Sequence, residues 1–250
     1  MGEFCYNTFI MDERHYHLRE NTIDTSNPEN FLRALAGASY LPALESNAAA
    51  NLREQMSQEQ IVAYYTLLES FKDPETGDLN LEAHTIIRPK ALFHASSRGN
   101  ITEFEPREER KRSAEEPAQV FGSPSEAVSS MFLVPADDRF IKSGSYDNAK
   151  TWTYIIGDWE NFKAMDKGGY IYTLPPETFG ADPNKGLGLF EWTSQSPVKP
   201  KAKKYFSSGL SAMREYGVKV YVVDQETFAR FKLEQDDIKI LESFEPYTEQ

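Results

Sequence analysis

The sequence predicts an α+β protein, in which a helical N-terminal region packs on a small, curved, mostly antiparallel sheet with a cleft. Two observations lead to this fold class. Two helix starts, each followed by apolar residues at helical spacing, make roughly the first 80 residues mainly helical, whereas short apolar runs bounded by glycine and proline follow from residue 86 onwards. The regular strand–helix alternation of a doubly wound parallel sheet does not occur. We therefore expect a mainly helical region over residues 1–85, an α+β domain of catalytic type over 86–232 and an acidic C-terminal tail over 233–250.

Composition and charge indicate the size of the folded domain and the kinds of molecule that it could bind. The chain has 250 residues, of which 40% are hydrophobic and 26% charged, which suits one large globular domain with an extension. Its formal net charge of −12 argues against broad binding to nucleic-acid phosphates, although a local basic patch stays open. Nucleic acid is therefore not the expected partner, while an acidic surface suits a basic protein partner.

Cysteine usage and hydropathy bear on the compartment. The single cysteine, Cys5, cannot form an internal disulfide and fits a reducing environment. No apolar run reaches the length of about 18 residues that a membrane span needs, and the N-terminus is too polar and acidic for a signal peptide. We expect a soluble cytoplasmic protein with no membrane partner.

The first 26 residues are mixed in character. His15 and His17 are the residues among them that could have a chemical role. On a strand these two rings share a face and could ligate a metal ion. Two ligands do not close a metal site, and no third is identifiable by spacing. We therefore expect an exposed polar segment and no metal.

Two helices are expected in the N-terminal region. Asn27 and Pro28 form a helix start, a side-chain cap followed by proline, and Gly37 ends that helix. Ser57 and Gln60 form a capping box that starts the second helix. Apolar residues then recur at helical spacing, and we interpret them as packing surface: Ile61, Tyr64, Tyr65, Leu68 and Phe71.

Short strands begin near residue 86. One is expected at 91–95, and residues 105–117 then form a dense charged run. This run predicts a solvated loop, with a mobile loop over a cleft as the alternative. A brief strand at 119–122 leads into a helix start in which Ser123 is the cap and Pro124 the first helical residue.

Later strands complete the expected sheet. They are predicted at 151–156, 167–174, 189–194 and 218–223, and helices follow caps at Ser207 and Asp224.

Two charged segments close the chain. Lys199, Lys201, Lys203 and Lys204 predict a solvated sheet edge, with contact to nucleic acid or pyrophosphate as the alternative. The acidic tail from Glu234 is expected to be solvated. The alternative is that Ile238, Ile240 and Leu241 dock one turn or strand onto the domain.

Common catalytic signatures are absent from the sequence. It contains no Gly-x-Ser-x-Gly elbow, no HExxH or CxxC motif and no Gly-x-Gly-x-x-Gly dinucleotide fingerprint. What remains is an ordered trio: His94 at the exit of a strand, Phe121 on the strand before a helix, and Glu191 on a late strand. Each also has a purely structural explanation, as a core histidine, a core aromatic and a solvent-facing strand residue.

The order and local context of this trio resemble the ADP-ribosyltransferase-like fold family. Leu92-Phe-His-Ala-Ser96 is similar to the family's histidine strand, Val120-Phe-Gly-Ser-Pro to its aromatic strand and following helix, and Glu191-Trp-Thr-Ser to its glutamate strand. The resemblance covers roughly residues 88–223. It departs at Ala95, where the family usually has glycine, at Phe121, where many members have tyrosine, and at Leu189, which disfavours the arginine-modifying branch.

The resemblance implies NAD as a substrate and a role for each residue. His94 would hydrogen-bond an NAD ribose, Phe121 would stack on the nicotinamide, and Glu191 would stabilise the oxocarbenium-like state as nicotinamide leaves. Ala95 belongs to the same NAD-binding motif, and Ser96 and the amides near Ser123 would contact phosphates. The implied activity is ADP-ribosyl transfer to an acceptor that the sequence does not name. The alternative is a non-catalytic acidic interaction module on the same fold.

Overall fold

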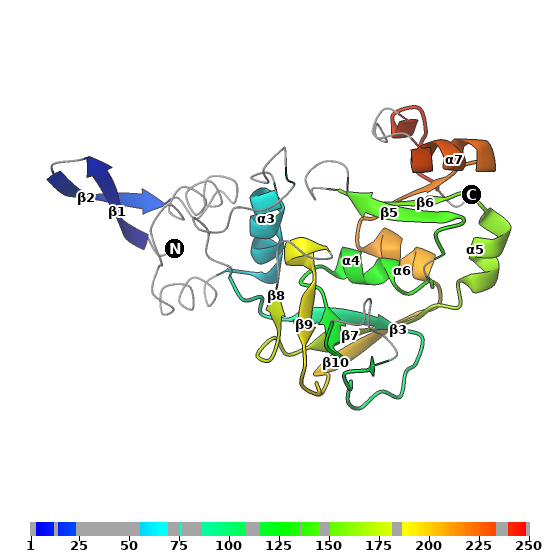
Figure 1. The fold of residues 1–250 in the computed structure, drawn as a ribbon, viewed down its shortest axis with the longest axis horizontal. Coiled ribbons are helices and arrows are strands. Elements are labelled where there is room, and N and C mark those ends of the chain that lie inside the picture. Colours follow the sequence, from blue (N-terminus) through cyan, green and yellow to red (C-terminus); the bar gives the residue numbers. More distant parts are fainter. Residues whose placement is uncertain are drawn as a thin grey trace. The chain divides into compact units, whose positions relative to one another are not determined.

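The structure is a computed structural model that describes residues 4–12, 15–23, 56–69, 76, 87–108, 116–135, 137–145, 151–181, 187–233 and 240–248 (Figure 1). The chain forms two compact units, Met1–Lys90 and Ala91–Gln250, and each is described by itself. The boundary lies five residues beyond the expected end of the N-terminal region at residue 85.

The N-terminal unit contains a hairpin as well as a helix. Strands β1 (Phe4–Asp12) and β2 (His15–Ile23) pair antiparallel, with Asp12 opposite His15. The expectation of a mainly helical region is therefore wrong for this stretch. A connection of only two residues favours antiparallel pairing, in which the backbone hydrogen-bonding groups of the two strands satisfy one another. The side-chain pattern of this stretch is too irregular to predict the two strands. The helix expected at Asn27 lies outside the described residues.

Helix α3 (Gln58–Glu69) begins at the predicted capping box. The Ser57 amide donates to Gln60 Oε1 over 2.7 Å, and the Gln60 amide donates to Ser57 Oγ over 3.2 Å. Both halves of the box are thus present, which satisfies amides that the first helical turn leaves open. Ile61, Tyr64 and Tyr65 are buried, as the helical spacing predicted.

Three small sheets build the second unit (Figure 1). The first contains β3 (Leu92–Ser96), β7 (Gly169–Leu174) and β10 (Ala202–Phe206) in the order β10-β7-β3, and both its pairs are antiparallel. The second has β4 (Val120–Gly122), β9 (Trp192–Ser194) and β8 (Gly180–Ala181) in the order β4-β9-β8. A bridge between Phe93 and Ser123 joins β3 of the first sheet to β4 of the second.

The third sheet contains the parallel pair. Its strands are β5 (Ile141–Ser145), β6 (Trp152–Ile156) and β11 (Lys219–Val222), in the order β11-β6-β5, with β11 parallel to β6 and β5 antiparallel to it. The predicted α+β class with mostly antiparallel small sheets is confirmed at this level.

Four helices of this unit have their bounds in the described residues: α4 (Glu126–Met131), α5 (Trp159–Met165), α6 (Gly209–Glu215) and α7 (Gln225–Leu233). Helices α4 and α6 pack on each other and lie between the sheet β10-β7-β3 and the sheet β11-β6-β5 (Figure 1). Helix α5 was not predicted. Its start is nevertheless encoded locally, because Asp158 Oδ1 accepts from the Asn161 amide over 3.0 Å.

The cap of α4 differs from the prediction. Ser125, not Ser123, is the N-cap, and its Oγ accepts from the Val128 amide over 3.3 Å. Ser123 instead follows β4 directly and pairs with β3, because its backbone exchanges two hydrogen bonds with Phe93. The helix therefore begins two residues later than expected. Ser208 likewise replaces Ser207 as the cap of α6, whereas Asp224 accepts from the Thr227 amide over 2.7 Å at the start of α7, as predicted.

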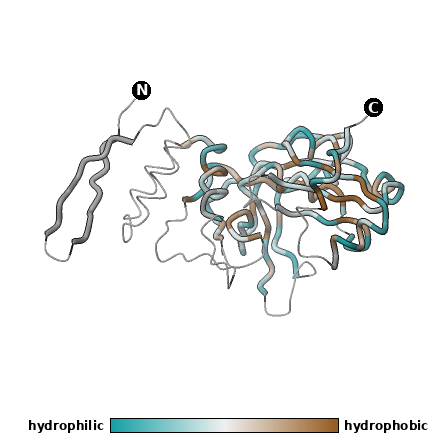
Figure 2. The backbone as a smooth tube through the Cα atoms, turned by 90° about the horizontal axis from the view of Figure 1, so that it is seen from above, coloured by the Kyte–Doolittle hydropathy of each residue, from teal (hydrophilic) through white to brown (hydrophobic). Residues whose placement is uncertain are grey.

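Two hydrophobic clusters hold the second unit together. One joins the sheet β10-β7-β3 to α4 and α6, and it contains Phe93, Leu133, Ile171, Phe206 and Ala212. Figure 2 shows hydrophobic stretches running through the interior of this unit, with hydrophilic stretches along its outer turns. Each large side chain buried in this way contributes about 1.5–3 kcal/mol through removal of its apolar surface from water.

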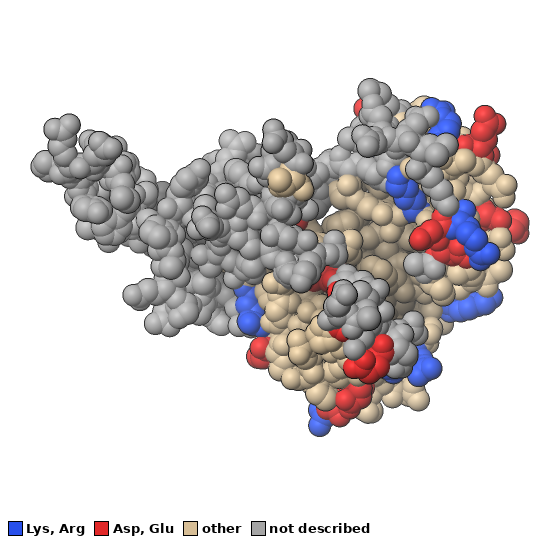
Figure 3. All heavy atoms as spheres, in the orientation of Figure 1, with Lys and Arg blue, Asp and Glu red and all other residues tan. Residues whose placement is uncertain are grey.

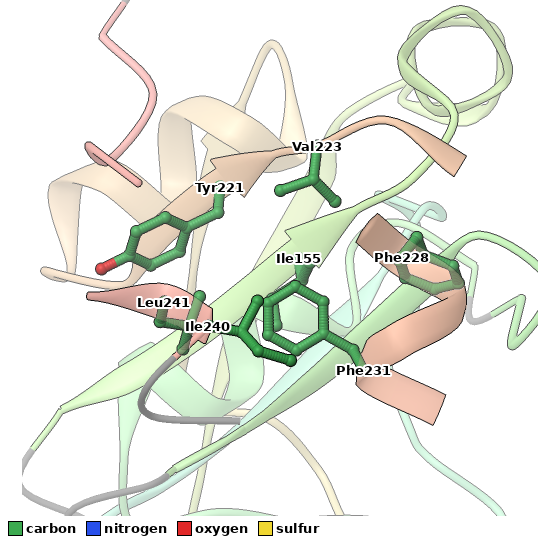
Figure 4. Packing of buried hydrophobic residues seen from close by; sticks show 7 residues of the cluster. All are labelled: Ile155, Tyr221, Val223, Phe228, Phe231, Ile240 and Leu241. Carbon is green, nitrogen blue, oxygen red and sulfur yellow. The ribbon is translucent and has the colours of Figure 1, made fainter. Parts of the chain in front are cut away.

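The second cluster includes the C-terminal segment. Ile155, Tyr221, Val223, Phe228 and Phe231 converge on Ile240 and Leu241 (Figure 4). The Tyr247 amide also donates to Val220 O over 2.7 Å. Of the two expectations for the acidic tail, docking of Ile240 and Leu241 is therefore the correct one, while Ile238 lies outside the described residues. On the face seen in Figure 3, acidic and basic side chains are interspersed over the described surface.

Candidate functional site

His94 lies on β3 and is fixed by the neighbouring strand. Its Nδ1 lies 2.8 Å from Phe121 O, and its half-buried ring packs on Phe104 with centroids 4.6 Å apart. Because the carbonyl only accepts, Nδ1 carries the proton and Nε2 is left as an acceptor in the neutral ring. No hydrogen bond engages Nε2 among the residues that the structure describes.

The environment of His94 favours the neutral ring. Burial lowers its pKa below the ordinary histidine value; the bond to the Phe121 carbonyl opposes this shift, and the positive charge of Arg107 adds to it. A neutral ring with Nδ1 already committed can accept one further hydrogen bond through Nε2. Such a group suits a ligand hydroxyl.

Strands β3 and β4 part beside His94. Phe93 and Ser123 exchange both backbone hydrogen bonds, with N···O distances of 2.7 and 2.9 Å. In a continuing antiparallel ladder the next hydrogen-bonded pair would be Ala95 with Phe121. That pair does not form within the described residues, and the His94 ring takes the Phe121 carbonyl instead. The main-chain N–H and C=O of Ala95, which point the same way as those of Phe93, therefore face the gap between the strands.

The second and third motifs lie on adjacent strands. In the pairing of β4 with β9, Gly122 is opposite Trp192, so the register continued by one residue brings Glu191 beside Ser123. By strand alternation Phe121, Ser123 and Glu191 share one face of the sheet, while His94 and Ser96 belong to the other. The three motifs thus lie on adjacent strands, but the predicted residues do not share one surface, and Glu191 lies across β4 from the gap.

Glu191 stands before a strand and not within one. The stretch expected to be a strand from residue 189 begins instead as a short 3-10 helix, η3 (Gly188–Phe190), and the Glu191 amide donates to Gly188 O over 3.0 Å. Gly188 has a φ of 58°, a left-handed conformation that glycine adopts without strain. Trp192 Nε1 donates back to Leu189 O over 3.1 Å and closes the turn. Glu191 is half-buried at the entry to β9.

The two predicted serines have local partners. Ser96 Oγ accepts from the Arg98 amide, and the buried Ser123 accepts from the Ser125 amide through Oγ, both over 3.2 Å. The Ser123 amide is taken by Phe93 O and the Val128 amide by Ser125 Oγ. These amides are therefore already engaged, and the structure lends no support to phosphate contact at Ser123.

A row of aromatic rings extends from His94 across the sheet and was not predicted. Phe104 stacks edge-on against Tyr172 with centroids 5.1 Å apart, and Tyr172 lies 6.2 Å from Tyr170. Tyr170 in turn lies 5.2 Å from Tyr205 on β10. The spacing of two residues between Tyr170 and Tyr172 indicates a shared strand face. Nothing in the sequence indicates that Phe104 and Tyr205 join them.

A groove of about 510 Å³ lies away from these residues, between the end of β6 and helices α5 and α7. Arg139 in its lining pairs with Asp137 over 2.6 Å, and Asp158 pairs with Asn161 over 2.7 Å. Arg139 and Asp137 thus pair with each other, and Asp158 accepts from a neutral side-chain amide. Across the described ranges, no three His, Cys, Asp or Glu side chains gather to hold a metal ion, and no helix is long and apolar enough to cross a membrane.

Comparisons of this chain with protein-family models, with curated proteins and with solved structures gave no match.

Proposed function

We propose that the Ala91–Gln250 unit binds NAD and transfers its ADP-ribosyl group to an acceptor. One observation supports the proposal: β4 has β3 on one side and β9 on the other, so the three motifs, far apart in sequence, lie on three adjacent strands. The residues that these motifs contribute are His94, Phe121 and Glu191.

The main chain of Ala95, which has no hydrogen-bond partner across the gap among the described residues, supports a specific contact in this proposal. An N–H and a C=O that point the same way from one residue complement a group with one acceptor and one donor, such as the carboxamide of nicotinamide. The Ala95 side chain packs against the cluster formed with Phe93 and Leu133, so its methyl group does not enter the gap. Alanine in place of the family's glycine is therefore compatible with this contact.

The remaining residues would divide the work. His94 would accept a hydrogen bond from a ribose hydroxyl through Nε2, and the Phe121 ring would stack on the nicotinamide. In the chemical step the bond between the ribose C1′ and the nicotinamide nitrogen breaks, and its electron pair leaves with neutral nicotinamide. An acceptor nucleophile then bonds to C1′ and gives up its proton to solvent. Glu191 would stabilise the positive charge that develops on the ribose.

Nicotinamide release tests the proposal. Glu191→Gln keeps size and hydrogen-bonding shape but removes the charge, so we expect release to fall by roughly 10²–10³ while NAD binding persists. His94→Ala should weaken binding as well, because its proposed work is to hold the ribose. Glu242→Gln, a change at an exposed carboxylate elsewhere, is the matched control. Equal release from the wild type and Glu191→Gln would contradict the catalytic role of Glu191.

A second candidate is a non-catalytic module that binds a basic protein partner. The observation in its favour is that the amides expected to bind phosphate near Ser123 are already engaged. It predicts no calorimetric heat with millimolar NAD and a partner whose capture is insensitive to Glu191→Gln. Partner capture that depends on Glu191 would argue against this candidate.

A further inference from the structure

A strip of cations and aromatic rings runs across the sheet β10-β7-β3, from its outer strand β10 over the central strand β7 to the loop after β3. Strand β10 is the outer strand of this sheet, as the lysine pattern predicted, and Lys201, Lys203 and Tyr205 are exposed on it or just before it. Arg98 is exposed in the loop after β3, and Tyr170 lies on β7 opposite Tyr205. We call these five residues the basic–aromatic strip.

The strip is held in place by specific contacts. Lys203 Nζ lies 5.2 Å from the centroid of the Tyr170 ring and donates to Gly99 O. Gly99 packs so closely on Tyr170 that a Cβ there would lie 2.4 Å from the ring. The Tyr172 hydroxyl donates to Arg98 O over 2.8 Å, which anchors the loop that carries the Arg98 side chain. The cations and the rings are therefore positioned together by the fold.

The charge of the strip contrasts with that of the chain. Lys199 and Lys204 at the same edge pair with Glu103 and Glu215. Within the described residues, Arg98, Lys201 and Lys203 form no ion pair with a carboxylate. In a protein of net charge −12, three positive charges with no carboxylate partner in the described part of the chain are a local feature suited to a polyanion.

The exposed ring selects among polyanions. Tyr205 is 60% exposed and its ring is tilted by 53° from that of Tyr170, so one large aromatic face stands in solvent on the strand that also carries Lys203. Single-stranded nucleic acid offers both matching groups, bases that stack on aromatic rings and phosphates that pair with cations. A duplex keeps its bases stacked internally, and an acidic peptide supplies only the charge.

We propose that the basic–aromatic strip binds single-stranded nucleic acid, with a base stacked on Tyr205 and the phosphates along Arg98, Lys201 and Lys203. The site differs from the NAD gap and does not depend on NAD chemistry. With three phosphate contacts, each weighted by about 0.7 for single strands, the affinity should fall roughly fourfold for each doubling of salt. The overall negative charge of the chain keeps the expected affinity modest.

Fluorescence anisotropy of the full chain with a labelled 12-nucleotide single-stranded RNA, without NAD, tests the proposal. We expect Tyr205→Ala to weaken binding by about 5- to 160-fold, the range for losing one stacked base. The double variant Arg98→Gln/Lys203→Gln should reduce the salt dependence. Phe132→Ala, which removes another exposed ring (58% exposed) at the end of α4, is the matched control and should bind like the wild type. Thermal melts of each variant exclude unfolding as a cause.

Three results would overturn the proposal. They are the absence of binding at low salt, equal affinity for the same sequence as a duplex, and unchanged affinity in folded Tyr205→Ala. Displacement of the RNA by polyglutamate at equal charge concentration would assign the strip to acidic peptides instead. Because the readout is binding without NAD, these outcomes are separate from failure of the proposed transferase activity.

Discussion

The burial of His94 makes the stability of the Ala91–Gln250 unit depend on pH in a predictable direction. Burial holds the pKa of His94 below the ordinary value of about 6.5 that applies to the unfolded chain. Its neutral form is therefore favoured by folding. The stabilisation is fully present above the unfolded pKa and is lost as pH falls from about 6.5 toward the folded pKa, by at most about 1.4 kcal/mol per pH unit.

His94→Asn isolates this contribution. Asparagine places an amide donor near the position of Nδ1, so the Phe121 carbonyl keeps a partner, but it does not titrate. We expect the wild type to lose up to about 1.4 kcal/mol more unfolding free energy than His94→Asn between pH 7.5 and 5.5.

Urea denaturation followed by tryptophan fluorescence is a suitable measurement, because all three tryptophans, Trp152, Trp159 and Trp192, belong to this unit. His94→Phe is the complementary variant. It leaves the Phe121 carbonyl without its partner and should cost about 1–3 kcal/mol at pH 7.5. Identical pH dependence in the wild type and His94→Asn would refute the argument, since it would mean that His94 titrates alike in the folded and unfolded chains.

The remaining predictions for this unit concern the hydrogen bonds of two buried tyrosines and the packing around one glycine. The buried Tyr154 hydroxyl has no hydrogen-bond partner among the described residues, so Tyr154→Phe should leave stability unchanged or raise it by up to about 1 kcal/mol. Tyr172→Phe, which removes the bonds to Arg98 O and from the Ile101 amide, should lower stability in the same urea titration by about 1–3 kcal/mol, and the reverse order would contradict this account. A Cβ at Gly157 would lie 2.4 Å from Phe228 Cγ, so Gly157→Ala should cost about 1–3 kcal/mol by overpacking. Gly144→Ala on β5, where a Cβ meets nothing within 4 Å, is its control and should melt close to the wild type.

Features encoded within a few residues could be predicted from the sequence. The capping box of Ser57 and Gln60 and the cap at Asp224 are examples, because each cap bonds an amide only three residues away. The lysines of the β10 edge belong to the same class, since an exposed edge strand favours charged side chains.

Features that depend on distant residues could not be predicted. Ser123 and Ser125 are both good caps, and only the pairing of Ser123 with Phe93, thirty residues earlier, decides between them. The docking of Ile240 and Leu241 depends on an apolar surface built by β6, β11 and α7. The β1–β2 hairpin depends on pairing that its weak side-chain alternation does not indicate.

The candidate site shows the same division. The order of the motifs and the placement of His94 on a strand were available from the sequence, but the partner of His94 was not, because Phe121 O lies on a strand 27 residues away. The sequence also could not predict which face of the sheet each residue occupies. Strand register assigns Phe121 and Glu191 to one face and His94 to the other. Within the described residues β3 parts from β4 after the Phe93–Ser123 pair, and the proposed contact depends on the main chain of Ala95 that faces the resulting gap. A glycine at position 95 would give the same main-chain groups, so the identity of that residue matters less to the proposed site than the point at which the two strands separate.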